Sequence, residues 1–273
     1  MNPGPGISPA SGLSPSPYRH LESPMIGQTT PYPQFNIADY IKIRRSIYTF
    51  RMIFMYLIKI GGSLTYSAKH LLDSLKSFCN ENSGKYKIII VPGGGEFANV
   101  VRNIYKTTEL SNDASHKLAT LCTDLTGIYF SELSDIRTVD NLYDAKSILK
   151  KEDILIILPS KIVLSNDELP HSWDITSDSI AVYIAKLLNL DNLIIATNVD
   201  GIYTEYPKGK LLNTINAKSI KGFTSVDSYL PNLLIKHNIE CFVVNGKYPN
   251  RIINILKNNN DIYTKIIIDK KSK

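Results

Sequence analysis

The chain has 273 residues, of which 43% are apolar and 21% are charged, enough to bury a sizeable core in one large or two small domains. This composition excludes an intrinsically disordered protein and a disulfide scaffold. The net charge is +6, and residues 1–54 contribute +3 of it through five basic and two acidic residues. The small positive charge of the remaining chain is weak evidence for a nucleic-acid partner, and it suits an enzyme that acts on anionic substrates equally well.

Residues 1–54 differ in composition from the rest of the chain. Residues 1–34 hold eight of the fourteen prolines, interleaved with glycine and serine. Such a segment buries too little apolar area to offset its ordering entropy, so we expect disorder. Met55 directly precedes a strong strand and is a candidate for the true start of translation. We therefore interpret residues 1–54 as a disordered or non-native extension, with a partner-binding tail as the alternative.

From Met55 onward, apolar strand-like runs alternate with helix-like segments. The expected strands are Tyr56–Ile60, Ile88–Val91, Ile154–Leu158, Leu193–Thr197, Cys241–Val244 and Ile266–Ile268. Several are apolar at nearly every position, which is typical of parallel strands covered on both faces. The expected amphipathic helices are Leu64–Cys79, Phe97–Tyr105, Ala114–Phe130, Ser179–Leu188 and Pro249–Leu256. This order predicts a three-layer αβα sandwich with a mostly parallel central sheet.

Ligands of parallel α/β sheets bind at the carboxyl ends of the strands, and the first such end is Lys59–Ser63 (KIGGS). Its two glycines let backbone N–H groups approach phosphate oxygens, and the following helix N-terminus adds a favourable dipole. Lys59 would place a cation beside a transferring group. Alone, this turn is weak evidence, because glycine often serves only the turn itself.

The second strand end is 91–98 (VPGGGEFA). Three consecutive glycines cost folding entropy without a packing return, which favours close backbone approach to a ligand over a plain loop. The segment is not a P-loop, because the GxxxxGK[ST] spacing is absent.

Two further polar turns follow. In 173–180 (WDITSDSI), Asp178 is either a site residue or part of an ordinary helix cap. In 196–203 (ATNVDGIY), a buried strand ends in a turn whose Asp200 could meet a nucleotide or only satisfy the turn.

In this order, the four motifs resemble the amino acid kinase superfamily over about residues 55–269. The resemblance implies the fold of that superfamily, with an acceptor-binding half at about 55–170 and a nucleotide-binding half at about 171–269. Within it, the chain is most similar to the archaeal [5-(aminomethyl)furan-3-yl]methyl phosphate kinases of methanofuran biosynthesis. The segments that carry this similarity are 59–72, 91–104, 115–125, 157–165, 171–179, 196–203 and 242–252. The implied reaction converts ATP and a furanyl phosphate monoester into ADP and a furanyl diphosphate, with Mg²⁺.

The resemblance also implies a role for each motif. Lys59 would stabilise charge on the transferred phosphoryl group, and Asp178 would organise the catalytic lysines or the magnesium. The ATP phosphates would be cradled by Gly61, Gly62 and Ser63, and the acceptor phosphate would face Gly93, Gly94 and Gly95. The residues implied for the adenosine side are Thr197, Asp200, Gly201 and Tyr203, with Lys210 reaching the ATP phosphates. An acceptor that is already a phosphate oxygen needs no strong general base.

The acceptor pocket leaves alternatives open for each candidate. Trp173 would stack on the furan ring or fill the core. Glu96 or Asp124 would pair with the ammonium of the aminomethyl group, although Glu96 also suits the first turn of a helix for its dipole alone. His116 is a polar pocket residue or a packing residue.

Two other functions compete with this interpretation. One is another kinase of the superfamily, acting on isopentenyl phosphate, UMP or an acylamino acid. By resemblance, Pro92 and Glu96 beside the glycines argue against isopentenyl phosphate, and Glu96 with the nearest arginine only at Arg102 argues against UMP. The other is a non-catalytic nucleotide- or oxyanion-binding protein on the same fold, against which the presence of both Lys59 and Asp178 argues. Tyr263–Thr264 departs from the Gly–Thr pair that is common before the last strand in the superfamily.

The remaining features concern compartment and partners. The three cysteines are far apart without CxxC spacing, which indicates reduced, buried thiols and no metal site. No apolar run reaches the roughly 18 residues of a membrane span, and no signal-peptide pattern opens the chain. We therefore expect a cytoplasmic homo-oligomer that binds ATP and a small-molecule phosphate, but neither nucleic acid nor membrane.

Overall fold

The computed structural model describes residues 53–166, 168–205, 209–221 and 224–269. The predicted N-terminal extension therefore lies almost entirely outside the described residues. At its boundary, the first strand begins at Phe54, whose N–H donates to the Lys85 carbonyl at 2.8 Å. This strand thus includes one residue that precedes Met55.

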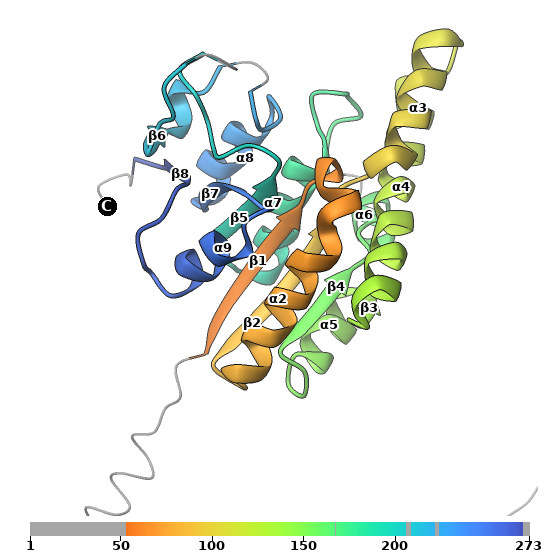
Figure 1. Ribbon diagram of the computed structural model, residues 1–273. Helices are drawn as coiled ribbons and strands as arrows, with labels where there is room; N and C mark the ends of the chain where they lie inside the picture. Colours follow the sequence, from red (N-terminus) through yellow and green to blue (C-terminus); the bar gives the residue numbers. More distant parts are fainter. Residues whose placement is uncertain (1–52, 167, 206–208, 222–223, 270–273) are drawn as a thin grey trace, which may run out of the picture. The chain divides into compact units, whose positions relative to one another are not determined.

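One sheet of eight strands runs through the described chain, in the spatial order β3-β4-β2-β1-β5-β7-β8-β6. The strands are β1 (Phe54–Ile60), β2 (Tyr86–Pro92), β3 (Thr138–Val139), β4 (Ile154–Ile157), β5 (Asn192–Thr197), β6 (Thr214–Asn216), β7 (Glu240–Asn245) and β8 (Thr264–Ile267). All neighbouring strands are parallel except β7 and β8, which are antiparallel. Because β2 and β5 flank β1, the carboxyl ends of these three strands meet at one edge (Figure 1).

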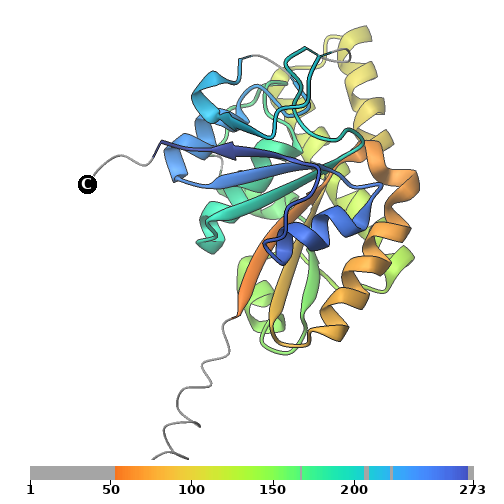
Figure 2. The same ribbon diagram turned by 60° about the vertical axis from the view of Figure 1, so that its left-hand side comes forward.

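Helices cover both faces of the sheet, as Figures 1 and 2 show from two directions. On one face lie α2 (Ala68–Glu81) and α9 (Pro249–Leu256), with Phe130 of α4 (Asn112–Ser134) in the same core. The other face is covered by α5 (Leu142–Ile148), α6 (Ser160–Asn166), α7 (Ser177–Leu188) and α8 (Leu230–His237). The described chain is completed by α3 (Gly95–Thr107) and the 3₁₀ turns η1 (Gly62–Ser67) and η2 (Ala217–Ser219). No described helix is both long and apolar enough to cross a membrane.

Strand sequences explain why the sheet is covered twice. All seven residues of β2 are buried, and in β1 Leu57 belongs to one core while Ile58 and Ile60 belong to the other. Side chains of a strand alternate between its faces, so a continuous apolar run needs a helical layer on each side. The predicted three-layer αβα sandwich with a mostly parallel sheet is confirmed.

The sequence prediction missed several short elements. These are β3, β6, α5, α6 and α8, which have two to eight residues each. In addition, the expected helix Leu64–Cys79 begins as the 3₁₀ turn η1 and becomes α-helical only at Ala68. The six predicted strands all exist within one to two residues of their expected ends.

Candidate active site

A cavity of about 530 Å³ lies at the carboxyl edge of the sheet, where β1, β2 and β5 end. Its wall is formed by residues within 59–63, 94–102, 112–123 and 172–180, together with Thr197 and Ser225. The structure therefore brings residues of all four predicted motifs to one place. This position is the one that parallel α/β sheets use for ligands.

A buried ion pair lies on the wall of this cavity. The Lys59 ammonium is 2.6 Å from Oδ1 of Asp178, and the two side chains are only 8% and 7% exposed. The apolar run of β1 carries Lys59 at its penultimate position, and the first turn of α7 presents Asp178. Thr176 caps α7 by accepting a hydrogen bond from the Asp178 N–H at 3.3 Å. An ammonium fixed beside a cavity can stabilise negative charge that develops on a bound group.

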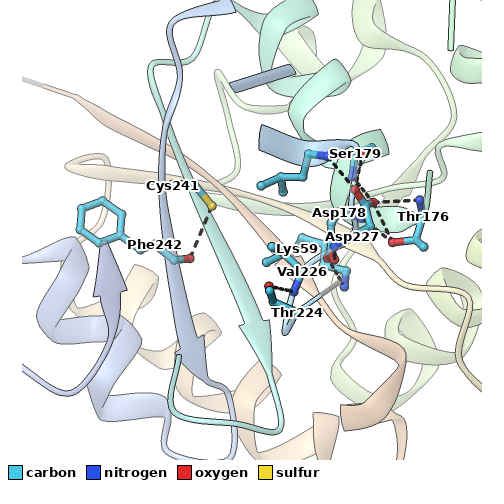
Figure 3. Close-up of polar contacts among 10 residues, drawn as sticks. Lys59, Thr176, Asp178, Ser179, Thr224, Val226, Asp227, Cys241 and Phe242 are labelled. Atoms are coloured by element: carbon cyan, nitrogen blue, oxygen red, sulfur yellow. Dashed lines mark hydrogen bonds and ion pairs between the residues drawn. The ribbon is translucent and has the colours of Figure 1, made fainter. Parts of the chain in front are cut away.

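Asp227, a residue that sequence reasoning missed, lies next to this pair (Figure 3). It is fully buried, and its carboxylate accepts hydrogen bonds from the N–H groups of Thr176, Ser179 and Leu230 at 2.8, 3.0 and 2.8 Å. Its own N–H donates to Oδ2 of Asp178 at 3.1 Å. Burial and the nearby Asp178 charge raise the pKa of Asp227, although the hydrogen bonds act in the opposite direction.

The glycine turns of the first two motifs pack against each other. A Cβ on Gly62 would lie 2.5 Å from the Gly95 nitrogen, and one on Gly93 would lie 2.7 Å from the Gly62 nitrogen. Gly95 also has a φ of 55°, which other residues rarely adopt. These glycines are thus required by the contact between the two turns, and not only by a ligand as the sequence suggested. Gly61, Gly62, Ser63, Gly94 and Gly95 line the cavity, whereas Gly93 lies behind them in this packing.

Helix α3 lines another part of the cavity with polar side chains. Glu96 in its first turn accepts a hydrogen bond from Asn99 at 3.3 Å, and Asn99 accepts one from Arg102 at 2.7 Å. The Arg102 guanidinium lies 5.2 Å from the ring centroid of Trp173, and Tyr105 packs against the same ring at 5.4 Å. Trp173 is therefore held as part of the cavity wall and not in the core.

His116 is nearly buried and also lines the cavity. Its ring stacks on His171 at a centroid distance of 4.5 Å, and Nδ1 of His171 lies 2.8 Å from Asp113. The hydrogen bond from His171, and then its charge, lower the pKa of Asp113. His116 thus combines the two roles that the sequence left open, packing and exposure to the pocket.

Asp124 is not part of the cavity wall, contrary to its candidacy as a partner of the substrate ammonium there. Its carboxylate accepts hydrogen bonds from the N–H and the hydroxyl of Ser160, the first at 3.0 Å, where α6 begins. Burial raises the pKa of Asp124 despite these bonds. The side chain therefore fixes the start of α6.

Of the residues expected on the adenosine side, one lines the cavity and the others lie outside its described wall. Thr197 lines the cavity, but Asp200, Gly201, Tyr203 and Lys210 are not among the residues that form its described wall. Asp200 is bound by Asn245 and Arg251 at 3.0 and 2.5 Å, and these partners lower its pKa although burial opposes them. Gly201 packs against Thr264, Tyr203 bridges to Leu211, and Lys210 is exposed.

Within the Tyr263–Thr264 pair, the threonine has a clear structural role. The buried Thr264 hydroxyl accepts a hydrogen bond from the Ile202 N–H at 2.8 Å and donates to the Leu212 carbonyl at 2.5 Å. Thr264 thus holds the turn that follows β5.

Besides Oδ1 of Asp178, which is ion-paired with Lys59, two buried polar atoms on the wall lack a hydrogen-bond partner in the described chain, Nε1 of Trp173 and Oγ of Ser225. Leaving such a group unsatisfied costs about 1–3 kcal/mol. A ligand or water in the cavity would satisfy both atoms, so the wall is suited to a ligand that carries hydrogen-bond acceptors.

Fold and site define the class of this protein. The model of the amino acid kinase family matches residues 55–245, which include all four motifs and the Lys59–Asp178 pair. The chain belongs to the amino acid kinase family, as the motifs indicated.

Comparison with individual proteins shows which members of the family the chain is similar to. Over 217 residues, the chain is 55% identical to [5-(aminomethyl)furan-3-yl]methyl phosphate kinase of Methanocaldococcus jannaschii, covering 79% of this chain and 100% of that one. It is 26% identical to the uridylate kinase of Methanococcus aeolicus, covering 73% and 90% of the two chains. The crystal structure of uridylate kinase from Archaeoglobus fulgidus superposes with a TM-score of 0.60 at 17% identity, covering 78% and 100%, which shows a shared fold.

Proposed function

We propose that this protein transfers the γ-phosphoryl group of ATP to [5-(aminomethyl)furan-3-yl]methyl phosphate, forming ADP and the diphosphate used in methanofuran biosynthesis. The observation that carries the proposal is the 55% identity to a kinase of that name over its entire length. The ion-paired Lys59 on the cavity wall supports it chemically.

The described side chains suit phosphoryl transfer without covalent catalysis. Such a reaction depends on positioning and on electrostatic stabilisation of the transferred group. Lys59 would neutralise charge on that group, and Asp178 would hold the ammonium in place. The backbone N–H groups of the turns at Gly61–Gly62 and Gly94–Gly95 would face the donor and acceptor phosphates.

Magnesium would enter with the nucleotide. Among the described residues, no cluster of three or more His, Cys, Asp or Glu side chains could cage a metal ion. Mg²⁺ usually keeps several waters and binds through one or two carboxylates and the substrate phosphates, so the ATP phosphates and water would supply most of its ligands and a remaining lone pair of Asp178 would supply one. When bound, the ion would neutralise phosphate charge.

The acceptor would lie along α3. Glu96 and Asp178 are the two carboxylates on the described cavity wall, and Asp178 is already paired with Lys59. Glu96 would therefore bind the ammonium of the substrate, while Asp124 is engaged by Ser160. The Trp173 ring, which Arg102 and Tyr105 of α3 contact, would meet the furan.

The nucleotide would occupy the opposite end, beside Thr197. The turn with Asp200, Gly201 and Tyr203 directly follows β5, and we propose that it meets the adenosine through its exposed side. Lys210 is exposed and could extend to the ATP phosphates. The assignment of an acceptor half and a nucleotide half stays a prediction.

We further propose that two copies of the chain associate through α4. Leu118, Leu121, Leu125 and Ile128 are 40–54% exposed, and their 3-4-3 spacing is the seam pattern of paired helices. Exposed apolar side chains also occur on α3, which packs against α4: Phe97, Val100 and Ile104. A single helix seam can pair with itself across a two-fold axis, so a second copy is the occupant we propose.

Sedimentation velocity tests this association. The doubly substituted Leu121→Glu/Leu125→Glu protein should sediment as a monomer while the wild type sediments as a dimer or larger. Tyr143→Glu, at an exposed aromatic position on α5 and not on α4, should leave the assembly unchanged. A monomeric wild type would contradict the proposal.

Coupled ADP release tests the function itself. Purified protein with MgATP is offered the aminomethylfuran phosphate, isopentenyl phosphate, UMP or acetylglutamate. Turnover with the furan phosphate alone is expected. Turnover with another acceptor would keep the reaction class and overturn the substrate, and silence with all four would favour a binding protein without catalysis.

A further inference from the structure

Asp227 is buried in a way that packing alone does not explain. Its described partners are neutral donors, which include the hydroxyls of Thr176 and Ser179 at 2.9 and 2.7 Å besides three N–H groups. Burying a carboxylate is costly unless every lone pair is used and a positive potential is near. Thr176 and Ser179 belong to the N-terminal turn of α7, whose dipole supplies that potential.

The same residue reaches the ion pair through its backbone. Oδ1 of Asp178 contacts Lys59, and Oδ2 accepts the N–H of Asp227, so both oxygens of Asp178 have a fixed partner. Figure 3 shows the chain of contacts from Lys59 through Asp178 to Asp227 and on to Thr176 and Ser179. Asp227 is separated from Asp178 by 49 residues, so this contact ties two distant segments together at the cavity.

The segment before Asp227 also enters the site. Ser225, two residues earlier, lines the cavity with a buried hydroxyl that lacks a partner in the described chain. Anchoring Asp227 on α7 therefore fixes the Asp178 carboxylate and the cavity-facing Ser225 at once.

We infer that Asp227 is a positioning residue for phosphoryl transfer, which acts by holding Asp178, and through it the Lys59 ammonium, in one geometry. This inference rests on the proposed function. It assigns Asp227 no contact with the substrates. Loss of its carboxylate should therefore lower kcat while leaving substrate binding nearly intact.

A kinetic double-mutant cycle tests the inference with Asp227→Asn, Asp178→Asn and the double variant. An amide at 227 would turn its NH₂ toward one of the three N–H donors, so the anchor is broken with little change in volume. We expect kcat of Asp227→Asn to fall about 30-fold or more, with both KM values changed less than about threefold. The double variant should be no slower than Asp178→Asn, because both changes disable one unit.

Controls separate this role from a general loss of stability. Asp153→Asn breaks another ion-paired aspartate, beside Lys87, and should lower the melting temperature without lowering kcat of the folded protein. If Asp227→Asn does not fold, Ser179→Ala removes one of the five donors and should lower kcat by a smaller factor. An unchanged kcat in the folded Asp227 variant, or losses that multiply in the double variant, would overturn the inference.

A second readout does not depend on activity. Acylation of Lys59 by an N-hydroxysuccinimide ester, followed by peptide mass spectrometry, should be faster in Asp227→Asn than in wild type by about fivefold or more, since its partner is released. Asp153→Asn should leave the Lys59 rate unchanged. If the wild type transfers no phosphate to any acceptor, the proposed function fails. The acylation rate of Lys59 then still decides whether Asp227 holds the Lys59–Asp178 pair in place. An unchanged rate would overturn the inference.

Discussion

Two lysine–aspartate pairs with little solvent exposure lie at the amino and the carboxyl ends of the central strands, and they differ in how many hydrogen-bonding partners they have. Lys87, near the start of β2, contacts Asp153 at 2.5 Å and also donates to the Glu152 carbonyl at 3.0 Å. Asp153 in turn accepts the Gly84 N–H at 2.7 Å. We call this the closed pair, because its ammonium and its carboxylate each have a further hydrogen-bonding partner within the protein.

The second pair, Lys59 and Asp178 at the carboxyl end of β1, is the open pair, because its ammonium borders the cavity. Within the described part of the chain, the Lys59 ammonium has one ion-pair partner, Asp178, and it lines the cavity. The remaining donors of the ammonium are free for a ligand. The same two residue types thus serve stability at one end of the sheet and, we propose, catalysis at the other. Four predictions sharpen this contrast.

The largest effect is expected for Asp178→Asn. Without the carboxylate, Lys59 loses its fixed position, so kcat should fall about 100-fold or more while the KM for ATP changes little. Steady-state kinetics with saturating MgATP measures both constants. A loss confined to KM would mean that Asp178 acts in binding.

For the closed pair, Lys87→Met should affect stability instead. It leaves the nearly buried Asp153 carboxylate without its cation, which costs about 1–3 kcal/mol of unfolding free energy. Urea unfolding measures this loss, and kcat per folded molecule should stay at the wild-type value. A large fall in kcat would show that the two ends of the sheet are not independent.

A smaller effect is expected at the acceptor wall. Glu96→Gln removes the proposed partner of the substrate ammonium, so the KM for the furan phosphate should rise about tenfold with kcat unchanged, as for the loss of one charge-assisted hydrogen bond. Asp124→Asn is the matched control, because that carboxylate serves Ser160. Equal effects of both variants would contradict the assignment.

The smallest effect concerns acid stability. Burial alone would raise the pKa of Asp153, but the hydrogen bonds from Lys87 and Gly84 outweigh it and lower that pKa. The stabilisation is therefore complete above the pKa of the unfolded state, about 3.9, and is lost as the pH falls through the lower folded value. Unfolding free energies between about pH 5 and pH 2.5 should fall less steeply for Asp153→Asn than for wild type. If the unfolding free energies of the two proteins fall with pH in parallel, Asp153 is not a source of the acid sensitivity.

The strands at the centre of the sheet were predictable because they are long and apolar. β1, β2 and β5 are buried on both faces, so their sequences carry a strong signal. β3 and β6, with two and three residues at the sheet edges, are too short for any periodicity to appear. The antiparallel entry of β8 depends on pairing with β7, which no local pattern encodes.

The site was predictable where residues sit in motifs and unpredictable where contacts are tertiary. Lys59 and Asp178 each stand at a punctuated strand end or helix start, so the sequence pointed to them. Asp227 does not stand at a glycine-marked strand end or a helix start. Its proposed role arises from hydrogen bonds to α7, which is 48 to 51 residues away in the sequence. Likewise, the sequence could not show that Gly62 and Gly95 need each other, because that requirement comes from two turns in contact.

The most direct test of the central claim is ³¹P NMR of the reaction mixture, with wild type and Lys59→Ala at equal concentrations of folded protein. Each is incubated with MgATP and [5-(aminomethyl)furan-3-yl]methyl phosphate. We expect the wild type to convert the monoester signal into diphosphate signals together with ADP, and the variant to leave it unchanged. Comparable conversion by the variant, or no diphosphate from the wild type, would contradict the claim that Lys59 completes a phosphoryl-transfer site here.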